Sequence, residues 1–158
     1  MDVVIDANIF GNAIDVRCLS QGTAIDTLTA LLSSSRSLAL DDTGGSAPAS
    51  ETSHLYLEYQ PFVHPGSVGA AILTKIALQG RLIYFPSCTH EERKQIEKLI
   101  PRNKKDRRVL GIGVASESRL IVTNDFSDFD VVVRKKVKKQ FKVNIIDSGS
   151  GADTILSP

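Results

Sequence analysis

Five short apolar runs, separated by segments with helical periodicity, restrict this chain to a small set of folds. The runs fall at residues 3–5, 38–40, 82–85, 120–123 and 143–146. Leu120-Ile121-Val122 is continuously apolar rather than alternating, which is typical of a strand buried on both faces of a parallel sheet. Helices that connect parallel strands cover both faces of such a sheet. The sequence therefore predicts an α/β fold, a three-layer α/β/α sandwich with a mainly parallel central sheet.

Capping signals mark the helices expected between these strands. Thr23 and Asp26 resemble a capping box at the start of one helix, and Thr89 opens another over residues 90–100. The remaining expected helices are a short one around residues 55–59, one from Ser67 to Gly80, one with Asp106 in its first turn, and a basic one near 130–140. Residues 43–50 are expected to form a loop. Residues 1–147 are expected to form a single domain, and residues 148–158 a C-terminal tail.

Charge is distributed unevenly along a chain of 158 residues whose net charge is only +1. Residues 1–58 contain eight acids against two basic residues, whereas residues 102–142 contain twelve of the nineteen basic residues. This separation favours a cation-binding pocket beside a surface that binds a polyanion. No apolar run approaches the roughly 20 residues that span a bilayer, and the start of the chain lacks a basic signal-peptide region. A cytoplasmic protein without membrane contact is expected.

Two residue types that often bind transition metals lack the spacing to do so here. Cys18 and Cys88 are isolated and form no CxxC motif. His54, His64 and His90 are equally scattered. Zinc or redox chemistry is therefore not expected, and both cysteines are interpreted as reduced thiols.

Four acids stand where a parallel sheet would bring side chains together. Asp6 ends the first strand, Glu58 lies in the short second-quarter helix, Asp106 opens a helix and Asp125 follows the fourth strand. Ligands of open α/β sheets bind beyond the carboxyl ends of the strands. Clustered carboxylates repel one another and need a compensating cation, and oxygen ligands favour hard ions. Mg²⁺ or Mn²⁺ is the expected cofactor.

The same residues resemble the PIN-domain nuclease family. The motifs are Asp6-Ala7-Asn8, Glu58-Tyr59, Asp106 in an apolar helix, and Thr123-Asn124-Asp125 followed by Asp128-Phe129. The resemblance covers about residues 2–147 and implies a PIN-like fold. It implies a metal-dependent endoribonuclease acting on single-stranded RNA, and many family members are toxins of toxin–antitoxin pairs. A cognate antitoxin protein and a homodimer are therefore among the partners that the resemblance suggests.

The resemblance also implies a role for each site residue. Asp6, Asp106 and Asp125 would bind metal, and Glu58 would hold metal or water; Glu51 competes with Glu58, and Asp128 is a further metal ligand candidate beside Asp125. Asn8 and Thr123 would orient the carboxylates through hydrogen bonds. The basic residues expected to contact the RNA backbone are Lys104, Lys105, Arg107, Arg108, Lys135 and Lys136.

Other interpretations of these residues remain open. A catalytically inactive PIN-like module that binds RNA or a protein partner would need the same fold without convergent acids. A phosphatase or phosphotransferase with Asp6 as nucleophile is less supported, because Asn8 stands where a partner acid would be needed. Asp106 could pair with Arg102 or Lys105 as an ordinary helix-start carboxylate. Tyr56 and Tyr59 fit the core or rim as well as base stacking.

Overall fold

The computed structural model describes residues 1–157, and its centre is one all-parallel sheet of five strands in the order β3-β2-β1-β4-β5. The strands are β1 (Asp2–Ile5), β2 (Ser37–Asp42), β3 (Leu82–Pro86), β4 (Leu120–Val122) and β5 (Asn144–Ile146). Each coincides with a predicted apolar run. The prediction of a three-layer α/β/α sandwich with a parallel sheet is confirmed, and the sheet is parallel throughout.

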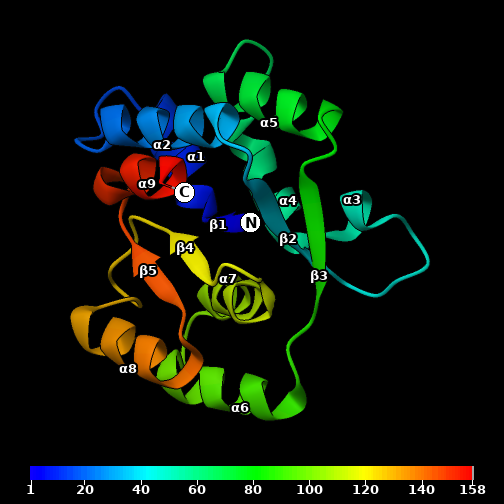
Figure 1. Ribbon diagram of the computed structural model, residues 1–158, viewed down its shortest axis with the longest axis vertical. Coiled ribbons are helices and arrows are strands. Elements are labelled where there is room, and N and C mark those ends of the chain that lie inside the picture. The colour runs from blue at the N-terminus through cyan, green and yellow to red at the C-terminus, as the bar shows by residue number, and fades with distance from the viewer. Residues whose placement is uncertain (158) are drawn as a thin grey trace.

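Helices cover both faces of this sheet (Figure 1). One layer contains α1 (Ala7–Ile14), α2 (Gln21–Ser33), α5 (Val68–Leu78) and α9 (Ser148–Leu156), and the other contains α6 (His90–Leu99), α7 (Lys104–Ala115) and α8 (Val131–Phe141). Three short elements, α3 (Ala49–Thr52), α4 (His54–Tyr59) and the 3₁₀ turn η1 (Gln60–Phe62), connect β2 to α5. The loop expected at 43–50 thus ends in the single turn of α3.

Close packing of α7 on the sheet depends on a glycine. A Cβ atom added at Gly113 would lie 2.5 Å from Cδ1 of Ile121 on β4. Such a distance is far below van der Waals contact, so only glycine lets the helix approach this closely. Val109, Leu110 and Ile112 of the same helix are buried. The position of α7, and of Asp106 in its first turn, is therefore fixed by the core.

The C-terminal segment differs from the prediction. Residues expected to be a tail instead form α9, which packs on α2 with Ile155 only 1% exposed. The buried side chain of Arg36 donates from Nε to the carbonyl oxygen of Ile155 at 2.9 Å and from Nη2 to that of Ser157 at 3.1 Å. These bonds satisfy carbonyl groups that the end of a helix leaves free. The helix is held by contacts distant in sequence, which local composition does not reveal.

One predicted helix start is also wrong. The helix expected to begin at Thr23 begins at Gln21, with Ser20 at the N-cap position. The hydroxyl of Thr23 instead lies 2.7 Å from that of Ser148 at the start of α9. By contrast, the predicted caps of Ser67 and Thr89 are present, and Thr89 forms the full capping box with Glu92.

The strand order creates a crevice between β1 and β4. From β1 the chain proceeds to β2 and β3 on one side, and then returns to β4 and β5 on the other. The connections that leave the carboxyl ends of β1 and β4 therefore run in opposite directions, which opens the crevice where ligands of such sheets bind. Asp6 and Asp125 follow these two strands.

None of the helices in residues 1–157 is both long and apolar enough to cross a bilayer. The 13 residues of α2 fall well short of the roughly 20 that a spanning helix needs.

Candidate active site

Asp6 is held in one orientation at the end of β1. It is the N-cap of α1, and its Oδ2 accepts hydrogen bonds from Nδ2 of Asn8 at 2.8 Å and from Oγ1 of Thr123 at 2.7 Å. Nδ2 of Asn8 also donates to Oγ1 of Thr123 at 2.9 Å, and Oδ1 of Asn8 accepts from the backbone N–H of Asn124 at 3.1 Å. These bonds join the ends of β1 and β4. The hydrogen bonds expected of Asn8 and Thr123 are therefore present in the structure.

Asp106 is a buried carboxyl group with an unused oxygen. It lies in the first turn of α7 with 5% of its surface exposed, and its Oδ2 atom has no hydrogen-bond partner among the described residues. Burial, followed by the nearby charges of Asp6, Asp125 and Asp128, raises the pKa of Asp106 to about 7. The two alternative pairings, with Arg102 or with Lys105, do not occur among the ion pairs of residues 1–157.

The pKa of Asp6 is raised for related reasons. Burial is the largest cause, and the negative charges of Asp125 and Glu58 add to it, while the hydrogen bonds from Thr123 and Asn8 oppose it. Both raised pKa values therefore reflect burial first and repulsion between neighbouring carboxylates second.

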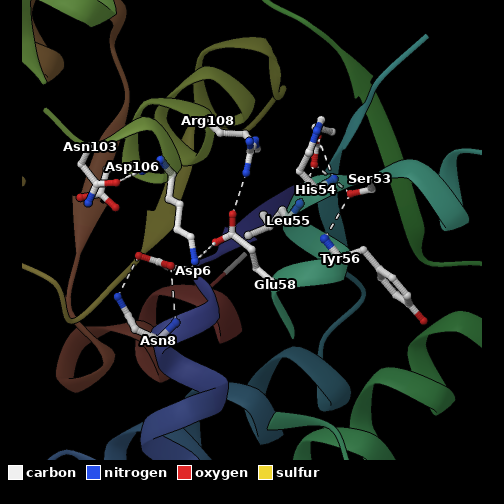
Figure 2. Close-up of polar contacts among 12 residues, drawn as sticks. Asp6, Asn8, Ser53, His54, Leu55, Tyr56, Glu58, Asn103, Asp106 and Arg108 are labelled. Carbon is white, nitrogen blue, oxygen red and sulfur yellow. Dashed lines mark hydrogen bonds and ion pairs between the residues drawn. The ribbon is translucent and has the colours of Figure 1, made fainter. Parts of the chain in front are cut away.

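Glu58 contributes the acid from the opposite wall. Its Oε1 lies 2.6 Å from Nη1 of Arg108, and its Oε2 lies 4.0 Å from Nζ of Lys105. Figure 2 shows Arg108 reaching from α7 toward Glu58 on α4. The alternative acid, Glu51, is exposed on α3 and does not line this site. Of the two glutamates, the structure brings Glu58 to the other acids.

Asp125 and Asp128 both lie near Asp106, but they are held differently. Oδ1 of Asp125 accepts hydrogen bonds from the backbone N–H and the hydroxyl of Ser127, at 3.0 and 2.5 Å. Oδ2 of Asp128 accepts from Nδ2 of Asn103 at 3.0 Å. Asp125 lines the same cavity as Asp6, whereas Asp128 is beside Asp106 and its charge acts on the pKa of that group.

These acids surround a cavity of about 560 Å³, which we call the acidic cavity. Its lining includes the four predicted acids Asp6, Glu58, Asp106 and Asp125, together with Asn8, Asn103, Lys105, Arg108, His54 and an apolar side formed by Ala7, Leu57, Pro61 and Phe62. The volume lies within the range of roughly 300–1,000 Å³ typical of ligand sites. Residues from β1, α4, α7 and the loop after β4 thus meet in one place.

The oxygen atoms of the acidic cavity fit a hard divalent cation. Oδ2 of Asp106 is buried without a partner among the described residues, and the negative charge of Asp125 adds to the burial that raises the pKa values of Asp106 and Asp6. Mg²⁺ and Mn²⁺ prefer oxygen ligands and accept a site formed by a few carboxylates and water. Within residues 1–157, no three His, Cys, Asp or Glu side chains form a ready-made metal cluster.

The predicted RNA-contacting residues divide into two groups. Lys105 and Arg108 line the acidic cavity, while Lys104, Arg107 and Arg108 line a neighbouring pocket. Lys135 and Lys136 are exposed on α8 and line neither of these spaces. Of the six predicted basic residues, the structure therefore brings Lys105 and Arg108 to the acidic cavity.

Two residues that support the site were not singled out from the sequence. Asp41, at the end of β2, accepts hydrogen bonds from the backbone N–H groups of His54 and Leu55 at 3.1 and 2.9 Å and from the hydroxyl of Ser53 at 2.8 Å. Asp41 thereby holds the first turn of α4, the helix that carries Glu58. Asn103 is the N-cap of α7 and also binds Asp128. An asparagine before a helix is a recognisable signal, but the partners of Asp41 are twelve or more residues away.

Tyr59 is a core residue rather than a stacking platform. Its ring is fully buried beside Phe10, and its hydroxyl donates to the carbonyl oxygen of Ile5 at 2.6 Å. It therefore ties α4 to the end of β1. Tyr56 packs edge-on against Tyr59 and is partly exposed.

No protein family, no curated protein and no solved structure matches this chain.

Proposed function

We propose that this protein is a metal-dependent endoribonuclease that hydrolyses phosphodiester bonds of single-stranded RNA, with an acidic site of the PIN-domain type. The observation that carries the proposal is the meeting of Asp6, Glu58, Asp106 and Asp125 at one cavity beside the β1–β4 crevice. A purely structural set of acids would be matched by basic partners. Here Asp106 has an unmatched buried oxygen and a pKa of about 7.

Asp6, Asp106 and Asp125 are the residues that would hold Mg²⁺ or Mn²⁺, with Asp128 as a further ligand candidate. When bound, such an ion supplies an activated water and stabilises the negative charge that develops on the phosphate. Asn8 and Thr123 keep the Asp6 carboxylate oriented through the bonds to Oδ2. Preorganisation of this kind raises the rate because the carboxylate need not be reoriented during the reaction.

Lys105 and Arg108 suit the binding of substrate phosphate. Both line the acidic cavity and both now face Glu58. A phosphate group entering the cavity offers them an alternative anion, and arginine binds phosphate in a two-point geometry. Glu58 would then be released to hold a water or the ion.

Cleavage of a 5′-labelled single-stranded RNA, with Mg²⁺ or Mn²⁺ and with EDTA, tests the proposal. Asp6→Asn and Asp125→Asn are expected to reduce the rate by more than the roughly 10- to 100-fold that outer-shell partners of a metal cost. Asp153→Asn is the matched control, because Asp153 is exposed on α9. Thermal unfolding of each variant verifies that the fold is retained. Cleavage that persists in EDTA would contradict the proposal.

A second candidate function is a non-catalytic module that binds RNA. It is favoured by one observation, namely that Arg108 and Lys105 already neutralise Glu58. This candidate predicts RNA binding that is insensitive to EDTA, with no cleavage under any metal condition. The same labelled RNA, followed by both gel shift and product formation, separates the two functions.

A further inference from the structure

A second pocket, of about 400 Å³, lies beside the acidic cavity, and we call it the basic pocket. The two spaces share His54 and Arg108 in their walls. The basic pocket lies between the ends of β2 and β3 and the helices α6 and α7. Its lining residues are Asp41, Asp42, Thr43, His54, Ser87, Cys88, Arg93, Ile96, Glu97, Lys104, Arg107, Arg108, Gly111 and Ile112. Any polymer bound at the acidic cavity has this pocket as a neighbour.

The positive charges of the basic pocket are only partly matched. Glu97 pairs with Arg107 at 3.5 Å, and Arg108 pairs with Glu58. Lys104 and Arg93 have no carboxylate oxygen within 4.0 Å among the described residues. Two basic side chains without a carboxylate partner among the described residues, one from α6 and one from the start of α7, suit an anionic group such as a phosphate.

The acids of the pocket are largely engaged by the protein itself. Asp41 is used by the first turn of α4, where the backbone N–H of Leu55 lies 2.9 Å from its Oδ1. Oδ1 of Asp42 accepts from the backbone N–H of Gly44 at 2.8 Å, which leaves its Oδ2 without a partner among the described residues. This oxygen can accept from an N–H group on the edge of a base, as carboxylates do in base recognition.

Between these walls the lining is apolar and open. Ile96 of α6 and Ile112 of α7 are 2% and 3% exposed. Gly111 has no side chain, and a Cβ added there would meet only Sγ of Cys88, at 3.6 Å. The space above Gly111, with an apolar floor beneath it, leaves room for the flat face of a base. A base joined through its sugar to a phosphate is a nucleotide.

We propose that the basic pocket binds one nucleotide of the RNA adjacent to the nucleotide at the acidic cavity. The phosphate of this nucleotide contacts Arg93 and Lys104, and its base lies over Gly111 and Ile112. This inference rests on the proposed function, since it makes the pocket a subsite for the same substrate. It assigns a role to Gly111, which is to leave room for the base.

Gly111 allows a direct test, because a side chain there would project into the pocket. Gly111→Met fills the space, whereas Gly111→Ala adds one methyl group in ordinary contact with Cys88. Both replace glycine in a helix interior, so neither weakens the helix by its propensity. Binding of guanosine 5′-monophosphate, chosen because guanine offers N–H donors to Asp42, is measured by calorimetry in EDTA. Gly111→Met should bind at least tenfold more weakly than wild type, and Gly111→Ala as wild type does.

Competition and cleavage experiments test whether the nucleotide site is part of the RNA-binding site. A six-residue single-stranded RNA should displace guanosine 5′-monophosphate from the wild-type protein, and Gly111→Met should raise the KM for RNA cleavage with little change in kcat. Equal binding by all three proteins, or RNA that fails to compete, would overturn the inference. If binding of guanosine 5′-monophosphate depends on Gly111 but the protein cleaves no RNA, the nuclease proposal is contradicted and the nucleotide site is not. Cleavage that is normal in Gly111→Met counts against the subsite alone.

Discussion

At the scale of single residues, the site is defined by carboxyl groups in unequal environments. Asp106 is buried with an unused oxygen, Asp6 accepts two side-chain hydrogen bonds, and Glu58 faces two cations. Burial raises the pKa values of both Asp106 and Asp6, and that of Asp106 reaches about 7.

The raised pKa of Asp106 predicts how stability changes with pH when no metal is present. Because the folded state binds this proton up to about pH 7 and the unfolded chain releases it near pH 4, the free energy of unfolding should fall as pH rises between these values. Asp106→Asn removes the titrating group and keeps its shape. In EDTA, the free energy of unfolding of Asp106→Asn should rise relative to that of the wild type between pH 5 and pH 8, by roughly 1–3 kcal/mol.

Urea unfolding of both proteins at several pH values measures this difference. The comparison cancels the titration of the other groups to the extent that they do not interact with Asp106. A constant difference across the pH range would show that the Asp106 carboxyl group ionises normally. Addition of Mg²⁺ should stabilise the wild type at pH 8 and leave Asp106→Asn much less affected.

Asp41 positions the helix that carries Glu58 without lining the acidic cavity itself. Burial alone would raise its pKa, but the hydrogen bonds from Leu55, Ser53 and His54 together bring it below the usual value. The ionised carboxylate therefore stabilises the fold at neutral pH, and this stabilisation is lost as pH falls through the lowered pKa. Asp41→Ala should cost roughly 2–3 kcal/mol at pH 7.

Hydrogen exchange distinguishes this local role from a general loss of stability. Amides in the first turn of α4 should exchange faster in Asp41→Ala than in wild type, because they lose the carboxylate that caps them. Asp42→Ala is the neighbouring control, since the only hydrogen bond to its carboxylate within residues 1–157 comes from Gly44. Unchanged exchange in α4 would refute the positioning role.

At the scale of elements, the position of the loop after β4 depends on α9, a helix that the local sequence pattern does not predict. The helix α9 packs on α2, and Arg36 binds its last carbonyl groups. The start of α9 also contacts the region of the site, because the hydroxyl of Ser148 accepts from Nδ2 of Asn124 at 3.0 Å. The C-terminal segment therefore supports the loop that follows β4.

Two adjacent residues of α9 test its contribution to stability. Ile155 is 1% exposed and Leu156 is 56% exposed. Ile155→Ala should destabilise the protein by roughly 2–4 kcal/mol through lost burial and a residual cavity, whereas Leu156→Ala should change stability by about 0.5 kcal/mol or less. Equal effects in chemical unfolding would mean that the helix does not dock in solution.

At the scale of the whole molecule, the parts of the fold that could be predicted are those that depend on the local pattern of apolar residues. The runs around Val4, Leu38 and Ile121 are apolar because their strands are buried on both faces. Parallel strands share one edge for their carboxyl ends, so Asp6 and Asp125 could be expected to approach each other without knowledge of the strand order.

What could not be predicted depends on tertiary contacts. The helix α9 contains two glycines and several small polar residues, and it is stabilised by Arg36 and by packing on α2. Gly151 allows α9 to approach α2 closely, since a Cβ at this position would lie 2.6 Å from Oγ1 of Thr27. The ion pair of Glu58 with Arg108 joins residues fifty positions apart. No local signal specifies such partners.

The uneven charge along the chain leads to a prediction about the path of RNA. Basic residues occur on both α7 and α8, but only those of α7 line the acidic cavity or the basic pocket. If RNA follows these spaces, Lys104 and Lys105 contact phosphates while Lys135 and Lys136 remain in solvent. Each phosphate contact on a single strand contributes about 0.7 to the slope of log affinity against log salt concentration.

Two double variants with the same change in net charge separate these paths. Lys104→Gln with Lys105→Gln should reduce the salt slope of RNA binding, measured in EDTA, by about 1.4. Lys135→Gln with Lys136→Gln should leave the slope unchanged, because long-range effects of exposed charges are screened beyond roughly 10 Å at 0.1 M salt. An equal reduction by both pairs would place α8 on the RNA path. A reduction by the α8 pair alone would separate RNA binding from the acidic cavity and remove the geometric basis for cleavage there.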